Sequence, residues 1–149
     1  MPLHFTAAEF AARKAETLRR MSAEGLDGLL MFRQESMYYL TGYDTFGYVF
    51  FQCLFLKADG RMTLLTRAPD ARVARYTSNI EDIRIWVDRV EANPAAELRE
   101  ILREQGCSGK RLGVEWDAYG LTAHNGRMLP AAPEGFCPLA AASLLVAPQ

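Results

Sequence analysis

The strongest constraint on the fold is a β-hairpin signal in the middle of the chain. Residues 49–56 form an apolar run interrupted only by Gln52, and residues 62–66 form a second strand-like run. Asp59-Gly60 lies between them, and this dipeptide favours a two-residue type I′ turn, in which both central residues need positive φ. A run that is apolar at both alternating positions is typical of a strand covered on both faces. We therefore predict an antiparallel strand pair whose first strand is buried on both sides.

Helices are predicted on both sides of this hairpin from capping residues and apolar spacing. Thr6-Ala7-Ala8-Glu9 has the form of a capping box, in which the threonine accepts a backbone N–H and the glutamate reaches back. Pro69 suits a first helical turn, where its missing N–H costs nothing. The predicted helices begin near Thr6, Ala68, Asn93 and Thr122 and end near Gly25, Ser78, Gly106 and Leu129.

Short apolar runs predict the other strands, at residues 27–32, 83–87, 111–116 and 135–140. Pro138 places the last of these at an edge of the sheet, because proline cannot donate to a strand ladder. Strands that alternate with helices after an antiparallel hairpin predict a three-layer α/β domain with a mixed sheet flanked by helices. The length of 149 residues is that of one domain, residues 1–149.

Composition narrows the class of protein. The net charge of −1 supplies no basic field for phosphates, so the sequence predicts no nucleic-acid partner. No apolar run reaches the ~20 residues of a membrane span, and no signal peptide is apparent at the N-terminus. The three cysteines are odd in number and widely spaced, which argues against a disulfide framework or a zinc site. We expect a cytoplasmic protein with no membrane association.

The residues themselves supply no complete catalytic group. His4 and His124 have no partner at helical spacing that would complete a metal site, and Cys53 lies within an apolar strand. Asp117 follows a predicted strand, where a carboxylate can be catalytic, but a helix N-cap is the favoured interpretation. We therefore predict no catalytic residue, no metal ligand and no cofactor within this chain.

An aromatic stretch carries the candidate contact site. Tyr38, Tyr39 and Leu40 are predicted to pack in the core from a short helix, whereas the segment between Gly42 and Gly47 is predicted to be an exposed loop. Rings on such a loop suit an interface or a ligand-lining surface, although plain packing is an equal alternative. The candidate substrate-contact or interface residues are Tyr43, Asp44, Thr45, Phe46 and Tyr48.

The order of these motifs resembles the N-terminal domain of the creatinase/prolidase family. The matching stretches are GLDGLLMF, SMYYLTGY, ADGRMTLLTR and RLGVEW, with Tyr39-Leu40-Thr41-Gly42-Tyr43 the most specific. The resemblance covers nearly the whole chain and implies a metal-dependent hydrolase, such as an Xaa-Pro dipeptidase, aminopeptidase P or creatinase. In that family a larger pita-bread domain holds the divalent metal ions, Mn, Zn or Co. We expect that domain to be absent from this chain, which ends at Gln149.

The resemblance also implies partners and a subfamily. It implies a homodimer in which the N-terminal domain contacts its own catalytic domain and closes over the other subunit's active site, where a small molecule or dipeptide binds. In creatinase-type members an aromatic residue and an arginine of this loop bind the substrate carboxylate, and Phe46 and Tyr48 fall near these positions. No arginine lies between Arg33 and Arg61, so the resemblance favours amidohydrolases such as ectoine hydrolase over creatinase.

Two functions stay open at this stage. The chain is either a non-catalytic N-terminal domain that shapes substrate access and dimer contacts in a hydrolase, or a stand-alone module that binds a small ligand or another protein. Continuation of the reading frame into a metal-binding segment would favour the first function, and a stop codon after residue 149 would favour the second.

Overall fold

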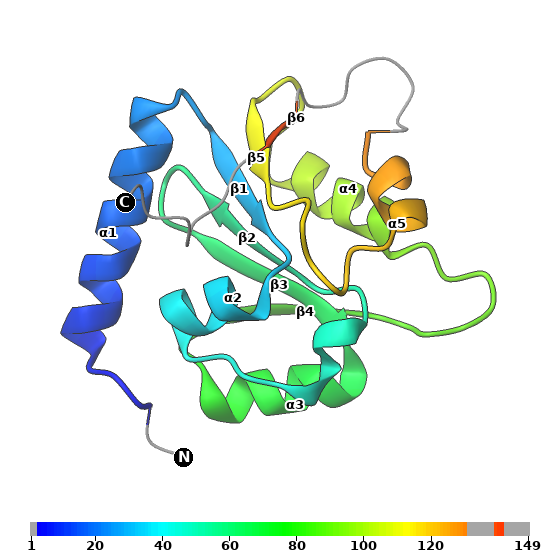
Figure 1. Ribbon diagram of the computed structural model, residues 1–149, viewed down its shortest axis with the longest axis horizontal. Helices are drawn as coiled ribbons and strands as arrows, with labels where there is room; N and C mark the ends of the chain where they lie inside the picture. Colours follow the sequence, from blue (N-terminus) through cyan, green and yellow to red (C-terminus); the bar gives the residue numbers. More distant parts are fainter. Residues whose placement is uncertain (1–2, 131–138, 142–149) are drawn as a thin grey trace.

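The chain folds around one six-stranded mixed sheet. The computed structural model describes residues 3–130 and 139–141, and the strand order within them is β4-β3-β2-β1-β5-β6 (Figure 1). The strands are β1 (Gly28–Met31), β2 (Cys53–Lys57), β3 (Met62–Arg67), β4 (Asp82–Trp86), β5 (Leu112–Val114) and β6 (Leu139–Ala141). The β2 strand pairs antiparallel with β1 and β3, whereas the β1–β5, β3–β4 and β5–β6 pairs are parallel.

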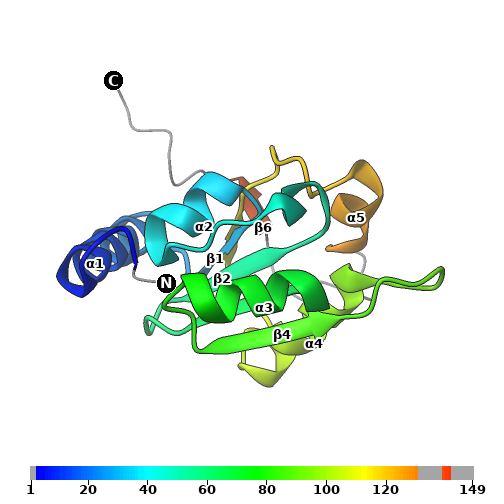
Figure 2. The same ribbon diagram turned by 90° about the horizontal axis from the view of Figure 1, so that it is seen from below.

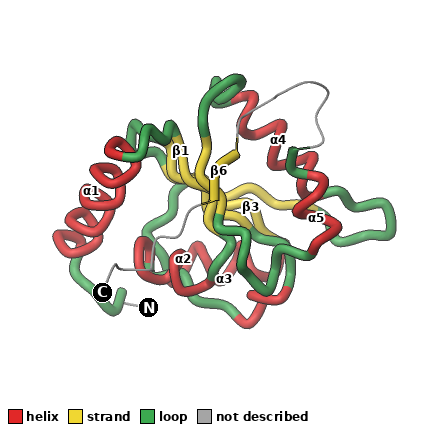
Figure 3. The backbone as a smooth tube through the Cα atoms, turned by 45° about the horizontal axis from the view of Figure 1, so that its top comes forward, coloured by secondary structure: helices red, strands yellow, loops and turns green. Residues whose placement is uncertain are grey.

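Helices cover both faces of the sheet. They are α1 (Ala7–Ala23), α2 (Gln34–Thr41), α3 (Ala68–Thr77), α4 (Pro94–Glu104) and α5 (Ala123–Met128), and Phe46–Val49 adds a 3-10 helix, η1. One buried cluster joins α1, α2 and α3 to one face, and a second joins α4 and α5 to the other. Figures 2 and 3 show the sheet between these two helical layers. The predicted three-layer α/β fold with a mixed sheet is confirmed.

The hairpin is confirmed, but its turn differs from the predicted type I′ turn. The Gly60 N–H donates to the Lys57 carbonyl, and the Lys57 N–H donates to the Arg61 carbonyl. The connection is therefore a three-residue loop that ends in Gly60, which takes the positive φ of +92°. Glycine is required here because a side chain would be strained in this left-handed conformation.

The predicted strand over residues 49–56 begins later than expected. The strand β2 starts at Cys53, whereas Val49 lies in the 3-10 helix and both Val49 and Phe50 are exposed. A continuous apolar run does not distinguish a buried strand from an apolar surface segment, so the sequence placed these side chains in the core. The predicted strand at residues 135–140 is described only from Leu139, and it lies at the sheet edge as expected.

Capping side chains start three of the helices, and two of these caps, Thr6 and Asn93, were predicted. The Thr6 hydroxyl accepts the Glu9 N–H at 3.1 Å, and the Thr122 hydroxyl accepts the Asn125 N–H at 3.2 Å. Asn93 caps α4 through its side-chain oxygen, which accepts the Ala96 N–H. The Glu9 carboxylate does not complete the capping box, because it binds Arg13 instead. These caps satisfy N–H groups that have no partner within the helix.

The Tyr39-Leu40-Thr41-Gly42-Tyr43 motif ends α2 and turns the chain back into the core. The Thr41 hydroxyl donates to the Met37 carbonyl at 2.6 Å and accepts the Tyr43 N–H at 3.1 Å. Gly42 takes a left-handed φ of +80°, the usual conformation just past a helix end. Leu40 is buried as predicted, whereas Tyr38 and Tyr39 are only half-buried. The motif therefore specifies a helix terminus and a core anchor.

The described part of the chain contains no helix that is both long and apolar enough to cross a membrane.

Candidate functional site

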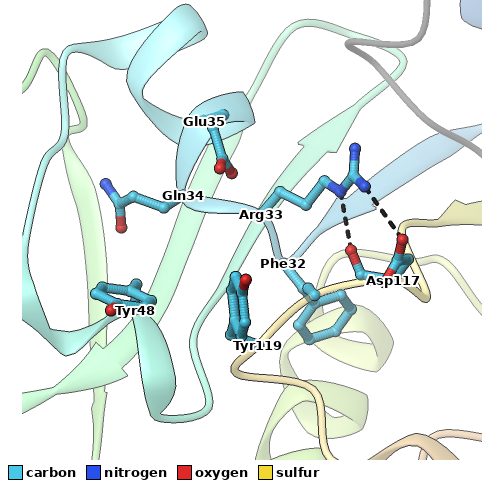
Figure 4. A pocket seen from close by; sticks show the side chains of 8 residues that line it. Phe32, Arg33, Gln34, Glu35, Tyr48, Asp117 and Tyr119 are labelled. Atoms are coloured by element: carbon cyan, nitrogen blue, oxygen red, sulfur yellow. Dashed lines mark hydrogen bonds and ion pairs between the residues drawn. The ribbon is translucent and has the colours of Figure 1, made fainter.

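A pocket of about 850 Å³ lies where β1 and β5 end. These neighbouring strands are parallel, so their carboxyl ends meet at one edge of the sheet. The chain leaves β1 for α2 on one face and leaves β5 for α5 on the other. Such a divergence opens a crevice beyond the strand ends, where α/β proteins commonly bind ligands. The lining residues are Phe32, Arg33, Gln34, Glu35, Tyr48, Asp117, Ala118 and Tyr119 (Figure 4).

Arg33 and Asp117 form one side of this pocket. The Arg33 Nε donates to the Asp117 main-chain carbonyl at 2.8 Å, and a terminal nitrogen lies 3.3 Å from the Asp117 carboxylate. The Asp117 side chain is 99% exposed, so water screens this ion pair. The favoured interpretation of Asp117 as a helix N-cap is wrong, because Thr122 caps α5. A carboxylate at the end of β5 instead faces an arginine at the end of β1.

A buried carboxylate fixes the backbone beneath the pocket. Glu115 is buried, and its two oxygens accept the Arg33 backbone N–H at 3.3 Å and the Ser36 hydroxyl at 2.6 Å. These bonds join the end of β5 to the start of α2.

Burial raises the pKa of the Cys53 thiol, and the charge of Glu115 raises it further, so Cys53 is a protonated core side chain.

Aromatic side chains form an exposed surface beside the pocket. Phe46 is 97% exposed, and Tyr48, Phe50 and Tyr119 are also exposed. The Tyr48 and Tyr119 rings meet edge to face, with 5.9 Å between their centroids. We call Phe46, Tyr48, Phe50 and Tyr119 the aromatic ledge. Exposed rings grouped in this way are typical of surfaces that contact a ligand or another protein.

The start of α3 holds the backbone of this ledge in place. Asp70 is 5% exposed; one of its oxygens accepts the Thr45 hydroxyl at 2.6 Å, and the other accepts Arg67 at 3.0 Å. Gly47 packs so closely on this carboxylate that a Cβ there would clash with it. The Arg67 guanidinium also stacks on the Phe50 ring, with its Cζ atom 3.4 Å from the ring centroid. The ledge is therefore anchored by polar contacts while its rings stay exposed.

Tyr43 does not belong to the ledge, and the prediction that its ring is exposed on the loop is wrong. Its side chain is 0% exposed, and its hydroxyl donates to Gln52 at 2.8 Å. The Gln34 side chain donates to the Tyr43 carbonyl at 2.8 Å and accepts from Gln52 at 3.1 Å. The ring is turned inward because the left-handed Gly42 reverses the chain directly before it. Asp44 is exposed, and Thr45 is half-buried by its bond to Asp70.

The burial of Tyr43 predicts a loss of stability at alkaline pH. Burial raises the pKa of the Tyr43 phenol above its ordinary value of 10.0. The unfolded chain therefore releases this proton at a lower pH than the folded chain. Its contribution to stability is complete below about pH 10 and is lost as pH rises above that value. Urea unfolding at several pH values should show a smaller alkaline decline for Tyr43→Phe than for the wild type; equal declines would contradict this assignment.

The described residues contain no group of three or more His, Cys, Asp or Glu side chains that could hold a metal ion. His4 bonds through Nδ1 to the Tyr38 hydroxyl at 2.6 Å, and His124 is exposed on α5. Cys53 and Cys107 are both buried. The side chains of 3–130 therefore do not fit a divalent metal site.

Sequence reasoning selected the aromatic loop as a candidate contact site but did not select Arg33, Glu35 or Tyr119, which line the pocket. Arg33, Glu35 and Tyr119 come from two strand ends that are more than 80 residues apart in the chain. The available signal was the parallel pairing of β1 with β5, which brings those ends together, but strand order cannot be read from apolar runs alone.

Comparison with known proteins identifies the family. The sequence profile of the Creatinase/Prolidase N-terminal domain matches residues 13–142. The chain is 30% identical over 130 residues to an uncharacterised hydrolase/peptidase of Sinorhizobium fredii, which covers 83% of this chain and 33% of that protein. It is 29% identical over 128 residues to the ectoine hydrolase of Halomonas elongata, covering 81% of this chain and 32% of that enzyme.

A solved structure agrees with these relatives. The dipeptidase of Pyrococcus horikoshii superposes with a TM-score of 0.70 at 26% identity, over 90% of this chain and 35% of that one. The chain thus spans about a third of the length of the curated relatives that it matches. Since the family profile covers most of the sequence and the fold agrees with it, this chain belongs to the creatinase/prolidase N-terminal domain family.

Proposed function

We propose that this chain acts as the non-catalytic N-terminal domain of a metal-dependent hydrolase, either an Xaa-Pro peptidase or an amidohydrolase. The relatives named above are a hydrolase/peptidase, an ectoine hydrolase and a dipeptidase, and each is about three times as long as the matched region. The described side chains do not fit a metal site. Divalent metal ions, Mn, Zn or Co, would be held by residues of a further domain, where they would activate water.

Within this proposal the ledge shapes substrate access or forms a contact with a second subunit. Asp44, Thr45, Phe46 and Tyr48 remain the contact residues of the loop, and Tyr43 supports them from the core. The single observation that carries the proposal is the near-complete exposure of the Phe46 ring on a backbone anchored by Asp70. An apolar ring fixed in water is costly to leave uncovered, and a partner surface or a substrate would cover it.

The similarity to ectoine hydrolase favours a small polar substrate over a long peptide. The chain has no arginine between Arg33 and Arg61, so the loop itself offers no guanidinium to a substrate carboxylate. Arg33, at the end of β1, lines the same pocket as Tyr48 and supplies that charge from outside the loop.

Phe46→Ala tests the role of the ledge. In the longer protein that contains this domain, we expect a rise in KM or a fall in kcat of about tenfold, because an exposed contact ring is removed. The melting temperature should change by less than about 2 °C, because the ring buries almost no surface within the domain. Steady-state kinetics and thermal unfolding measure the two effects.

Tyr76→Ala is a matched control, since Tyr76 is an exposed ring on α3 outside the loop and the pocket. Its kinetics should equal those of the wild type. Unchanged kinetics in Phe46→Ala, or a large fall in its melting temperature, would refute the proposed contact role.

A second candidate is a stand-alone module that binds a small ligand. It is favoured by the pocket at the ends of β1 and β5, whose lining side chains all come from this chain. Sequencing the gene beyond codon 149 separates the candidates. A following segment that encodes the family's metal ligands supports the hydrolase, and an immediate stop codon supports the module.

A further inference from the structure

A second cavity, of about 200 Å³, lies between α1, α2 and the start of β3. It shares no lining residue with the pocket at the ends of β1 and β5. Its walls are mostly apolar and come from two alanines of α1 together with Leu3, Phe10, Leu40 and Met62. Phe10 and Leu40 are buried, so they form the floor of the cavity. A concave apolar surface of this kind suits the hydrocarbon part of a small ligand.

Two polar side chains also line the cavity, and the described part of the chain engages neither of them. Lys14 is half-buried, and its ammonium group forms no ion pair within residues 3–130 and 139–141. Asn79 is exposed, and its side-chain amide forms no hydrogen bond within the same residues. None of the described residues that line the cavity is an Asp or a Glu. One cation and one amide, without a competing carboxylate, favour an anionic group on the ligand.

Contacts outside the cavity hold its walls together. Arg13 donates to the Tyr39 carbonyl at 2.9 Å, which ties α1 to α2. The Arg13 guanidinium also lies over the Phe5 and Tyr39 rings, with its Cζ atom 4.0 and 4.6 Å from their centroids. The Asn79 N–H donates to the Thr41 carbonyl at 3.1 Å, which ties the loop after α3 to the end of α2. The separation of the elements that form the cavity is therefore fixed by the domain itself.

We propose that this cavity binds an apolar monocarboxylate of about six carbon atoms, with its chain against Phe10 and Leu40 and its carboxylate between Lys14 and Asp-free Asn79. The size follows from the volume of the cavity, because a water molecule takes about 30 Å³ of the liquid and the cavity holds about six or seven groups of that size. Each buried methylene favours binding, and the Lys14 ammonium adds a charge-assisted hydrogen bond that an uncharged ligand lacks. This inference needs only residues of this chain and is independent of the proposed hydrolase function.

The test titrates the 149-residue chain with butanoate, hexanoate, decanoate and hexan-1-ol, and follows the NMR signals of the Leu3, Leu40 and Met62 methyl groups. Hexanoate should bind about tenfold more tightly than butanoate, because two further methylene groups are buried. Decanoate should bind no more tightly than hexanoate, because the cavity is then full. Hexan-1-ol should bind about fivefold more weakly than hexanoate, because it carries no charge for Lys14.

Variants separate the charged part of the cavity from its apolar part. Lys14→Gln should lower the affinity for hexanoate to that for hexan-1-ol and should leave the binding of hexan-1-ol unchanged. Ala11→Leu fills the cavity from an exposed position of α1 with a residue of similar helix propensity, so it should abolish the binding of both probes. Lys110→Gln and Ala12→Leu are matched controls at exposed positions outside the cavity, and both should bind as the wild type does.

Equal affinities for butanoate and hexanoate, unchanged binding in Ala11→Leu, or equal affinities of the wild type and Lys14→Gln for hexanoate would overturn the inference. Failure of the longer protein that contains this domain to bind hexanoate would also overturn it, because another part of that protein would then occupy the cavity. None of these results bears on the proposed role of Phe46, because that role is measured separately by the kinetics of the longer protein.

Discussion

Tyr43→Ala is expected to lower the free energy of unfolding by about 3–5 kcal/mol, the usual cost of removing a large buried aromatic side chain. The ring is fully buried in the cluster beneath α2, and the variant would also remove the Tyr43 hydroxyl, which donates to Gln52. For a chain of this length the melting temperature should fall by on the order of 10 °C. Urea and thermal unfolding followed by circular dichroism measure both quantities.

Two other substitutions in the same segment serve as controls for this result. Tyr43→Phe keeps the ring and removes only the hydroxyl, so it should cost about 1–2 kcal/mol. Phe46→Ala removes an exposed ring three residues along the same segment and should cost almost nothing. Similar losses in the free energy of unfolding for Tyr43→Ala and Phe46→Ala would contradict the conclusion that the Tyr43 ring lies in the core and the Phe46 ring on the surface.

Asp70→Ala is expected to be the second large effect, with a loss of about 3 kcal/mol. The substitution leaves the Arg67 guanidinium partly buried without its close carboxylate partner, and such unpaired charges are strongly destabilising. It also removes the acceptor of the Thr45 hydroxyl, so the ledge should lose its anchor. Hydrogen exchange at residues 45–50 should therefore increase more than exchange in β2 and β3.

Asp88→Ala is the matched control for Asp70→Ala. Asp88 also pairs with Arg67, but at 3.9 Å and with a largely exposed side chain. Its removal should cost less than about 1 kcal/mol and should leave exchange in the loop unchanged. Equal effects of the two substitutions would contradict the anchoring role of the buried carboxylate.

Much of the fold was predictable because local signals and the tertiary structure agree. Thr6 and Asn93 act as helix caps where the sequence placed them, and Asp59-Gly60 marks a real hairpin. The wrong assignment of Val49 and Phe50 to a buried strand has a definite cause. Val49 and Phe50 are as apolar as the strand residues that follow them, and only the three-dimensional structure shows that no helix layer covers them.

The site was predicted in part. Residues that lie close together in the chain could be selected from the sequence, whereas residues that lie far apart in the chain could not. The aromatic loop is continuous, so Phe46 and Tyr48 could be selected from composition and flanking glycines. Tyr43 was grouped with them because burial of a ring next to Gly42 depends on the direction in which the glycine turns the chain. Arg33 and Asp117 meet only through the β1–β5 pairing, and an arginine and an aspartate so far apart carry no local signal of contact.

The backbone of residues 45–50 is held from two directions. Asp70 restrains it on the side of α3, and Gly120 approaches the Phe50 carbonyl so closely on the other side that even one added methyl group would clash. Binding of a partner would therefore cost residues 45–50 little conformational entropy, because their backbone is already held in one conformation before binding. The same backbone conformation accepts other exposed side chains at positions 46 and 49. Substitutions at these two positions would therefore change which partner or ligand is bound without changing the fold.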